Sequence, residues 1–381
     1  MHPSTGNSSR LYRLADSDRL CRDSRHAQGA SCAGLAGPTV VTKVRRMKID
    51  IFNHFSPAPY FEEFCRLQPQ HPAATLFMRR PELYDIGARL RLLDQVDDYA
   101  QVLCLANPPI EAIATPEDAP RLARFANDQL AATVRAQPDR FPGFIAGLPM
   151  NNRAAIVPEA RRAIRELGAC GVQIFTNVNG VPLSDPAYFD LFAVMAELDR
   201  PVLVHPIRMG NHADYASESR SEAEVWFTFG WPYETSACMA RLIFAGLFDK
   251  LPGLKIVTHH MGGMIPYFAE KITLGFEQIF FGTMEKNPLA ERCGLKRPPL
   301  DYFMMLYGDT ATNGSVAATT CGYAFFGAER SVFATDAPFD PNGGVHLVKR
   351  TIAAVEALPI SVMEKAQIFE GNARRLFRQE R

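Results

Sequence analysis

The sequence lacks the features of several large protein classes. No apolar run approaches the ~18 residues that a membrane-spanning helix needs. Because 41 Lys and Arg balance 41 Asp and Glu, no excess charge is available to attract nucleic acid or an anionic membrane. The eight Cys include no Cys-x-x-Cys pair, which argues against a zinc cluster and a disulfide framework and is typical of a cytoplasmic protein.

Repeats and phosphate loops are missing as well. No internal repeat of ~20–50 residues is visible. The pair Gly262-Gly263 alone is too little for a Gly-rich phosphate-binding loop. Solenoid folds and the common nucleotide-binding motifs are therefore not indicated.

The first 46 residues differ from the rest of the chain. They are rich in Ser, Arg, Gly and Ala, have little apolar periodicity, and carry eight Lys or Arg against three Asp. Those three Asp argue against a transit peptide, which would be poor in acidic residues. Met47 opens Met-Lys-Ile-Asp-Ile, a natural start for a first strand. We expect residues 1–46 to be a disordered or mis-assigned extension, and residues 47–381 to form a single domain.

From Met47 onward, strand-like and helix-like stretches alternate, which predicts a parallel sheet. The expected strands span residues 48–54, 101–106, 141–148, 171–175, 202–205, 255–260, 304–307 and 332–334. The expected helices span residues 83–98, 116–137, 158–167, 185–198 and 235–248. An open, doubly wound sheet is the alternative. A closed α/β barrel, a distorted (β/α)8 TIM barrel of ~250 residues or more, brings distant strand ends together more naturally.

Four of these strands end in a His or an Asp. The segments are Ile-Asp-Ile-Phe-Asn-His (49–54), Val-Leu-Val-His-Pro (202–206), Ile-Val-Thr-His-His-Met-Gly-Gly (256–263) and Val-Phe-Ala-Thr-Asp-Ala-Pro (332–338). The carboxyl ends of barrel strands form one rim, where active sites are built. His54, His205 and Asp336 could hold a divalent ion there and leave positions open for water and substrate.

Two further residues on this rim have expected roles. His260 could act as acid–base partner of a bound water or stabilise an oxyanion. His259 should point to the opposite face of the strand, as a packing residue or as one that supports the site residues from behind. Asp309, near the end of the seventh strand, could orient His260 or cap the next helix.

At these residues the chain resembles the ACMSD-like branch of the amidohydrolase superfamily, the family of aminocarboxymuconate semialdehyde decarboxylase. The similarity runs from about Met47 to Phe377. Besides the His and Asp motifs, it covers Ala88-Arg89-Leu90-Arg91-Leu92-Leu93-Asp94, Pro138-Asp139-Arg140-Phe141, Gly230-Trp231-Pro232-Tyr233-Glu234-Thr235 and Gly371-Asn372-Ala373-Arg374-Arg375-Leu376. The resemblance implies a metal-dependent barrel, usually a homodimer, in which His260 and Asp336 are catalytic and His54, His205 and Asp336 bind zinc or a similar ion.

One position departs from the family pattern. The family's first strand normally offers Asp-x-His-x-His, and here Phe52 replaces the first of the two His. Asn53 cannot easily substitute, because it points to the other face unless a bulge intervenes. The loss is expected to weaken metal binding, or to require a water or substrate oxygen as ligand. A metal-free site is the alternative.

The expected substrate contacts come partly from the resemblance. Arg80 aligns with a basic residue that holds the substrate carboxylate, and Lys271 with a second one that the neighbouring subunit supplies. Lys offers a point charge without the bidentate fork of Arg. Phe52 and Trp231 could line an apolar pocket for a flat acid, although the aromatic residues near Trp231 could equally pack a loop on the barrel.

Three functions remain open from the sequence. The leading one is a decarboxylase, free of organic cofactors, that acts on a small unsaturated or aromatic carboxylic acid, with a divalent ion, zinc, at the site. A second is a hydrolase of an amide, lactone or carbon–carbon bond, which would use the same residues. A third is a degenerate barrel that binds a ligand without turnover, as the Phe52 substitution suggests.

Overall fold

The computed structural model describes residues 47–275 and 293–378, so the expected extension 1–46 lies outside the described residues. These described residues belong to one compact unit. Within the described ranges, no helix is both long and apolar enough to cross a membrane. The cytoplasmic location expected from the cysteine pattern stays a prediction.

Eight parallel strands form the centre of this unit. Their order in the sheet is β1-β2-β3-β4-β7-β8-β9-β10, and every neighbouring pair is parallel. Their bounds are β1 Lys48–Asp50, β2 Tyr99–Cys104, β3 Gly143–Gly147, β4 Gly171–Phe175, β7 Val202–His205, β8 Ile256–Thr258, β9 Tyr307–Asp309 and β10 Ser331–Val332. The short strands β5 (Asn177–Val178) and β6 (Val181–Pro182) form a separate antiparallel pair.

Backbone hydrogen bonds close this sheet between its first and last strands. The Ile51 amide donates to the Phe333 carbonyl at 3.0 Å, just beyond β1 and β10. Further along, the Asp336 amide donates to Phe52 O at 3.1 Å and the His54 amide to Ala337 O at 2.8 Å. The predicted TIM barrel is therefore confirmed, and the first and eighth strand ends are joined at the rim.

The strands are buried on both faces, as a parallel sheet covered by helices requires. Every residue of β2, β3, β4, β7 and β8 is buried. Ile49, Val102, Ile145, Leu203 and Val257 form a compact cluster together inside the barrel. A second, larger cluster joins the outward faces of the strands to the surrounding helices.

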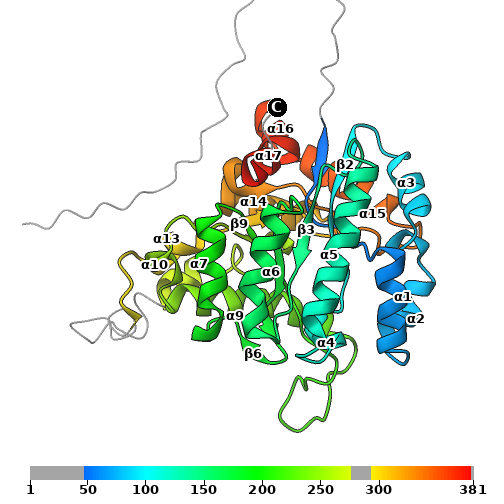
Figure 1. Cartoon of the computed structure of the whole chain (residues 1–381). Coiled ribbons are helices and arrows are strands. Elements are labelled where there is room, and N and C mark those ends of the chain that lie inside the picture. The colour runs from blue at the N-terminus through cyan, green and yellow to red at the C-terminus, as the bar shows by residue number, and fades with distance from the viewer. Residues whose placement is uncertain (1–46, 276–292, 379–381) are drawn as a thin grey trace, which may run out of the picture. The chain divides into compact units, whose positions relative to one another are not determined.

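Helices follow the strands and surround the barrel. Their bounds are α1 Ala58–Leu67, α2 Pro72–Met78, α3 Ile86–Leu93, α4 Ile110–Ile113, α5 Ala119–Ala136, α6 Arg153–Arg165, α7 Phe189–Glu197, α8 Val225–Thr228, α9 Gly230–Phe244, α10 Leu247–Lys250, α11 Ala269–Thr273, α13 Pro299–Phe303, α14 Val316–Arg330, α15 Val345–Glu356, α16 Val362–Ala366 and α17 Asn372–Phe377. Figure 1 shows α5, α6 and α7 side by side in front of the strands.

Helix α5 illustrates why these segments are helical. Leu122, Ala126 and Leu130 recur every four residues and are fully buried, whereas the opposite face is polar. Side-chain caps fix other helix starts, such as Asp85, which accepts from the Ala88 amide at 2.5 Å.

The seventh strand does not begin where the sequence pattern placed it. Residues 304–307 were expected to be extended, but Met304 ends helix α13 and the strand spans Tyr307–Asp309. Met304 is 47% exposed, so this apolar residue lies on the surface and not in the sheet. The shift places Asp309 within the strand, directly at the carboxyl rim.

Candidate active site

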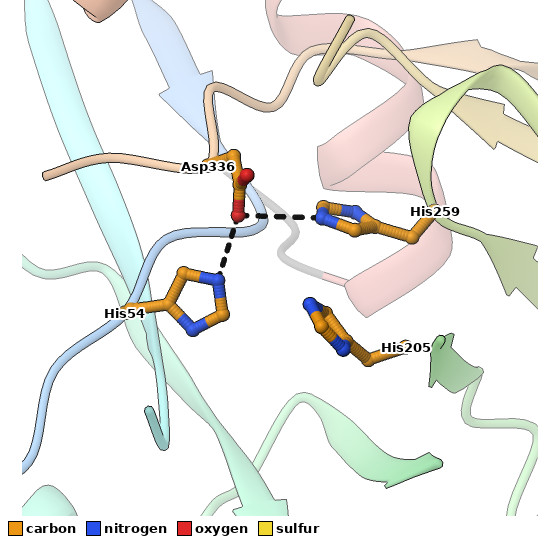
Figure 2. Close-up of side chains that lie close together, drawn as sticks. All are labelled: His54, His205, His259 and Asp336. Atoms are coloured by element: carbon orange, nitrogen blue, oxygen red, sulfur yellow. Dashed lines mark hydrogen bonds and ion pairs between the residues drawn. The ribbon is translucent and has the colours of Figure 1, made fainter. Parts of the chain in front are cut away.

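Four side chains from distant parts of the chain meet at this rim. His54, His205, His259 and Asp336 each offer one ligand atom, and these atoms lie within 4.8 Å of one another. Figure 2 shows the three imidazoles arranged around the carboxylate. They come from the ends of the first, fifth, sixth and eighth barrel strands. The expectation that His54, His205 and Asp336 share one site is consistent with this geometry.

Asp336 lies at the centre of the contacts. Its Oδ1 is 2.7 Å from His54 Nε2 and 3.4 Å from His259 Nε2. Its Oδ2 lies 3.7 Å from His260 Nε2. Asp336 has φ 63°, a left-handed conformation that is unusual for a residue other than Gly and tends to occur at functional sites. The chain therefore turns the carboxylate toward all three rings.

His205 presents one unused nitrogen to the cluster. Its Nδ1 lies 2.6 Å from its neighbour's carbonyl, Pro206 O, so this nitrogen carries the proton. Its Nε2 is buried and has no hydrogen-bond partner. A buried imidazole with a free lone pair is the state that a metal ligand requires.

The expectation that His259 faces away from the site is wrong. The alternation of side chains ends here, because β8 stops at Thr258 and His260 takes φ 55°. As a result the rings of His259 and His260 lie 3.8 Å apart, centroid to centroid, on the same side. The two adjacent histidines both reach Asp336.

Asp309 orients this His pair. Its Oδ2 lies 2.5 Å from His259 Nδ1, and its Oδ1 accepts from the His260 amide at 2.9 Å. Of the two roles expected for Asp309, it therefore serves orientation, and it acts on the His259 ring. A carboxylate behind a histidine sets the tautomer that leaves Nε2 facing a metal.

The pKa values reflect burial and close charges. Burial lowers the pKa of His205 well below its usual value, with neighbouring His259 and His54 adding to the effect. Burial also disfavours charge on His259, but Asp309 and Asp336 outweigh it and raise its pKa to about 9. Burial alone would raise the pKa of Asp336, yet hydrogen bonds from His259, His260 and His54 hold it well below the usual range.

His260 differs from the other histidines of the site in its exposure. Its side chain is 17% exposed, against 1% for His54 and His259. Burial, followed by the charge of His259, lowers its pKa. His260 is therefore the imidazole of this group that a molecule in the barrel mouth can reach most easily.

Phe52 lies among the histidines, where the family pattern would place another ligand. Its ring is 1% exposed, and its centroid is 4.1 Å from that of His259 and 5.5 Å from that of His205. The apolar ring therefore fills the space beneath the cluster. Its expected role as a substrate contact stays a prediction.

A buried arginine supports the first strand end. Arg89 is fully buried and donates to the backbone carbonyl of His54 and, at 3.0 Å, to Gln101 Oε1. Asn53 Nδ2 donates to Val102 O at 3.0 Å, which holds Asn53 away from the cluster. These contacts explain why His54 and not Asn53 faces the site.

The residues present fit a divalent ion. Three imidazole nitrogens and one carboxylate within 4.8 Å of one another match the number and type of ligands that such ions take. His205 Nε2 is buried and has no hydrogen-bond partner, and the Asp309 carboxylate holds the ring of His259. Both features also fit a bound divalent ion.

The other expected site residues lie at different distances from this cluster. Trp231 is adjacent, with its ring centroid 5.2 Å from that of His205, and its Nε1 donates to Arg208 O at 3.1 Å. Arg80 is half-buried and donates to Asp340 O at 2.5 Å, in the segment that follows Asp336. Lys271 is exposed on α11, with its Nζ 5.5 Å from the centroid of Phe268, and the structure gives it no contact with the four residues.

Gly262 and Gly263 serve packing in this structure. A Cβ on Gly263, which has φ 63°, would lie 2.5 Å from Pro232 O. The glycine thus lets the turn after His260 approach the first turn of α9, beside Trp231. The close backbone approach at Gly263 therefore serves a neighbouring helix.

Comparison with known proteins places the chain in a defined group. A family model described as "Amidohydrolase" matches residues 49–379. A gamma-resorcylate decarboxylase of Polaromonas sp. is 31% identical over 345 residues, which cover 88% of this chain and 99% of the relative. A 2-amino-3-carboxymuconate-6-semialdehyde decarboxylase of Dictyostelium discoideum is 28% identical, over 77% of this chain and 82% of the relative.

The fold comparison agrees with this grouping. A crystal structure of a dihydroxybenzoic acid decarboxylase from Polaromonas sp., with bound manganese and the inhibitor 2-nitroresorcinol, superposes with a TM-score of 0.72. The two chains are 29% identical, and the match covers 88% of this chain and 98% of the other. The barrel described above is thus shared along nearly the whole length of that protein.

Proposed function

The chain belongs to the amidohydrolase family, and from this premise we propose that it is a decarboxylase of a small aromatic carboxylic acid. The observation that carries the proposal is the convergence of His54, His205, His259 and Asp336 at the barrel rim, with His260 partly exposed beside them. Decarboxylase relatives that match along most of their length support it. Hydrolysis would use the same residues, but the relatives described above are decarboxylases and give it less support.

Each residue has a separate task in this proposal. His54, His205, His259 and Asp336 would hold a divalent ion, which supplies a Lewis acid that polarises a substrate oxygen next to the leaving group. The bond between the ring carbon and the carboxylate carbon breaks, CO2 leaves, and the electron pair stays on the ring carbon. His260, the partly exposed imidazole beside Asp336, would then pass a proton taken from water to that carbon, so that the ring carbon gains the proton that replaces CO2.

Arg80 is proposed to anchor the substrate carboxylate. Its guanidinium is half-buried and lies beside Asp340, four residues beyond Asp336. Arg can pair with a carboxylate through two parallel hydrogen bonds, which would set the direction in which CO2 departs. Trp231 and Phe52 would provide the apolar contacts with the ring.

The proposed ion is zinc. Imidazole suits zinc, whereas oxygen ligands suit magnesium and manganese, and this site offers three imidazoles for one carboxylate. Zinc also binds a given nitrogen–oxygen site more tightly than manganese in the general affinity order. The related Polaromonas structure contains manganese, so metal analysis has to separate the two ions.

Carbon dioxide release and metal content together test the proposal. We expect the purified protein to contain about one zinc per chain and to release CO2 from at least one hydroxybenzoic acid in a panel of aromatic acids. Mass spectrometry of the gas, with a carboxyl-labelled acid, measures the reaction. Hydrolysis of lactones or amides without any labelled CO2 would contradict the proposed reaction, and manganese as the bound ion would contradict zinc.

We also propose that the chain forms a homodimer through the face that carries α8, the start of α9 and the segment around α11. Large apolar side chains are exposed there: Phe227, Phe229, Tyr233, Tyr267 and Leu274. Single apolar residues on a surface are ordinary, but a group of aromatic ones favours an interface. Lys271 lies in the same region, as expected for a residue that reaches a neighbouring subunit.

Light scattering tests the dimer. We expect a mass of about twice 42.3 kDa for the wild-type chain. The double variant Phe229→Glu and Tyr267→Glu should give a monomer, because two charges would be buried without partners at the interface. A wild-type monomer at all concentrations would contradict the proposal.

A further inference from the structure

Buried polar atoms without partners gather in one sector of the barrel mouth. In the ranges that the structure describes, eight buried side-chain nitrogen or oxygen atoms lack a hydrogen-bond partner, and two of them belong to His54 and His205. Four others lie in β4 or in the segments after β2 and β3: Asn107 Oδ1, Glu111 Oε1, Asn151 Oδ1 and Gln173 Oε1. Proteins pair most of their buried polar atoms, so this concentration indicates a place where another molecule completes the bonds.

Two of these side chains line a common cavity. Glu111 and Gln173, which are 5% and 4% exposed, face it together with Leu105, Gly147 and Phe175. The volume open to the centre of a water molecule is about 10 Å3, close to the minimum for one water-sized group. The cavity therefore fits a single small polar group.

The cavity lies next to the ligand cluster. Phe175 lines it, and the Phe175 ring centroid is 5.4 Å from that of His205. One aromatic ring thus separates the cavity from a proposed metal ligand. A molecule bound at the cluster could extend a substituent into this space past Phe175.

The atoms that face the cavity without a partner are mainly hydrogen-bond acceptors. Gln173 Nε2 already donates to Leu105 O at 3.1 Å, so its remaining atom is the carbonyl oxygen. No Lys or Arg is among the lining residues. A carboxylate would find no cation to pair with here and would face the Gln173 oxygen, whereas a hydroxyl group can donate to that oxygen.

Glu111 adds a group that can both donate and accept. Burial raises its pKa to about 8, so the carboxyl is protonated at neutral pH. Burial, followed by the charge of Glu111, also raises the pKa of nearby Tyr60, whose hydroxyl is buried and has no partner. Both side chains therefore remain neutral in this sector.

We propose that the cavity bounded by Glu111 and Gln173 is a recognition subsite for a hydroxyl group on the aromatic substrate, separate from the carboxylate that leaves. The inference rests on the proposed function for its substrate class. It adds that a ring hydroxyl, and not a second carboxylate, is the feature that this sector selects. The other candidate occupant is a buried water molecule.

Equilibrium binding separates these two occupants. Calorimetry would compare benzoate, 3-hydroxybenzoate and 4-hydroxybenzoate on metal-loaded wild type and on Glu111→Leu, Gln173→Leu and Glu111→Gln. We expect the wild type to bind one hydroxybenzoate about tenfold more tightly than benzoate, as one added hydrogen bond implies. Glu111→Leu and Gln173→Leu should lose that preference and keep their affinity for benzoate, whereas Glu111→Gln, which still donates and accepts, should keep most of it.

Thermal stability gives a second measurement of the role of Glu111. If Glu111 only stabilised the fold, its replacement would lower the thermal midpoint. Glu111→Leu should not lower the thermal midpoint at pH 8, because it removes an unpartnered buried carboxyl. Since the pKa of Glu111 is raised on folding, its stabilising contribution is present below about pH 4.5 and is lost as the pH rises toward about 8. The wild type should therefore lose stability relative to Glu111→Leu as the pH rises from about 4.5 to about 8.

Two outcomes would overturn the subsite. A wild type without preference, or a preference that persists in both Leu variants, would mean that the cavity holds water only. Release of CO2 from the same acids is measured separately. If the Leu variants lose the preference for hydroxybenzoate but no CO2 is released, the subsite stands and the proposed reaction is wrong. If CO2 is released but the Leu variants keep the preference, the proposed reaction stands and the subsite is wrong.

Discussion

Replacing His259 with alanine is expected to remove most of the bound metal, and with it the release of CO2. His259 Nε2 is one of four ligand-type atoms within 4.8 Å of one another, and Asp309 holds its ring in place. Loss of a residue behind a ligand already costs ~10–100-fold in metal affinity, so loss of a ligand should cost more. Plasma mass spectrometry of the dialysed protein would measure the metal, beside His205→Ala as a positive control.

A second substitution in the same chain sharpens this test. The Phe52 ring lies 4.1 Å from that of His259, so an imidazole at position 52 would enter the same cluster. We therefore expect Phe52→His to restore metal to His259→Ala, at least in part. Full metal content in His259→Ala together with its loss in His260→Ala would assign the ligand role to His260 instead.

The fold could be predicted because its determinants are local and repeated. Strands buried on both faces appear in the sequence as short apolar runs. In the amphipathic helices between them, apolar residues recur with a period of about 3.6 residues. Boundaries were less certain where apolar residues lie outside the core. Met304, 47% exposed at the end of α13, is the clearest case.

Three of the four cluster residues could be predicted because a strand end determines where they lie. His54, His205 and Asp336 each follow an apolar run, and parallel strands bring such ends to one rim. His259 could not be placed by alternation, because the strand ends before it and His260 turns with a positive φ. The adjacent Gly262 and Gly263 were the available signal that regular strand geometry stops there.

The Phe52 substitution illustrates a second limit of sequence reasoning. A missing ligand is visible in the sequence, but a side chain that enters the same space from another strand is not. Phe52 and His259 lie just after the first and sixth barrel strands, more than 200 positions apart, and their rings are in contact. Only the closed barrel shows that the two side chains share one space, and in the proposed site His259 takes the place of the missing ligand.

Replacing His260 with asparagine is expected to lower kcat by about 100- to 10,000-fold while the metal remains bound. In the proposed reaction His260 delivers the proton to the ring carbon, and an amide cannot replace an imidazole in that step. The four cluster residues and the Asp309 contact to His259 are unchanged by this substitution. Stopped-flow or continuous CO2 assays give kcat, and metal analysis of the same sample provides the control.

The split between rate and metal content decides between two roles for His260. A proton donor predicts a low kcat, a KM close to that of the wild type and a full complement of metal. A ligand predicts that metal and kcat fall together and that added zinc restores both. His260 is 17% exposed, and its Nε2 lies 3.7 Å from Asp336 Oδ2. His54 and His259 both lie closer to the same carboxylate. This geometry therefore favours the role of proton donor for His260.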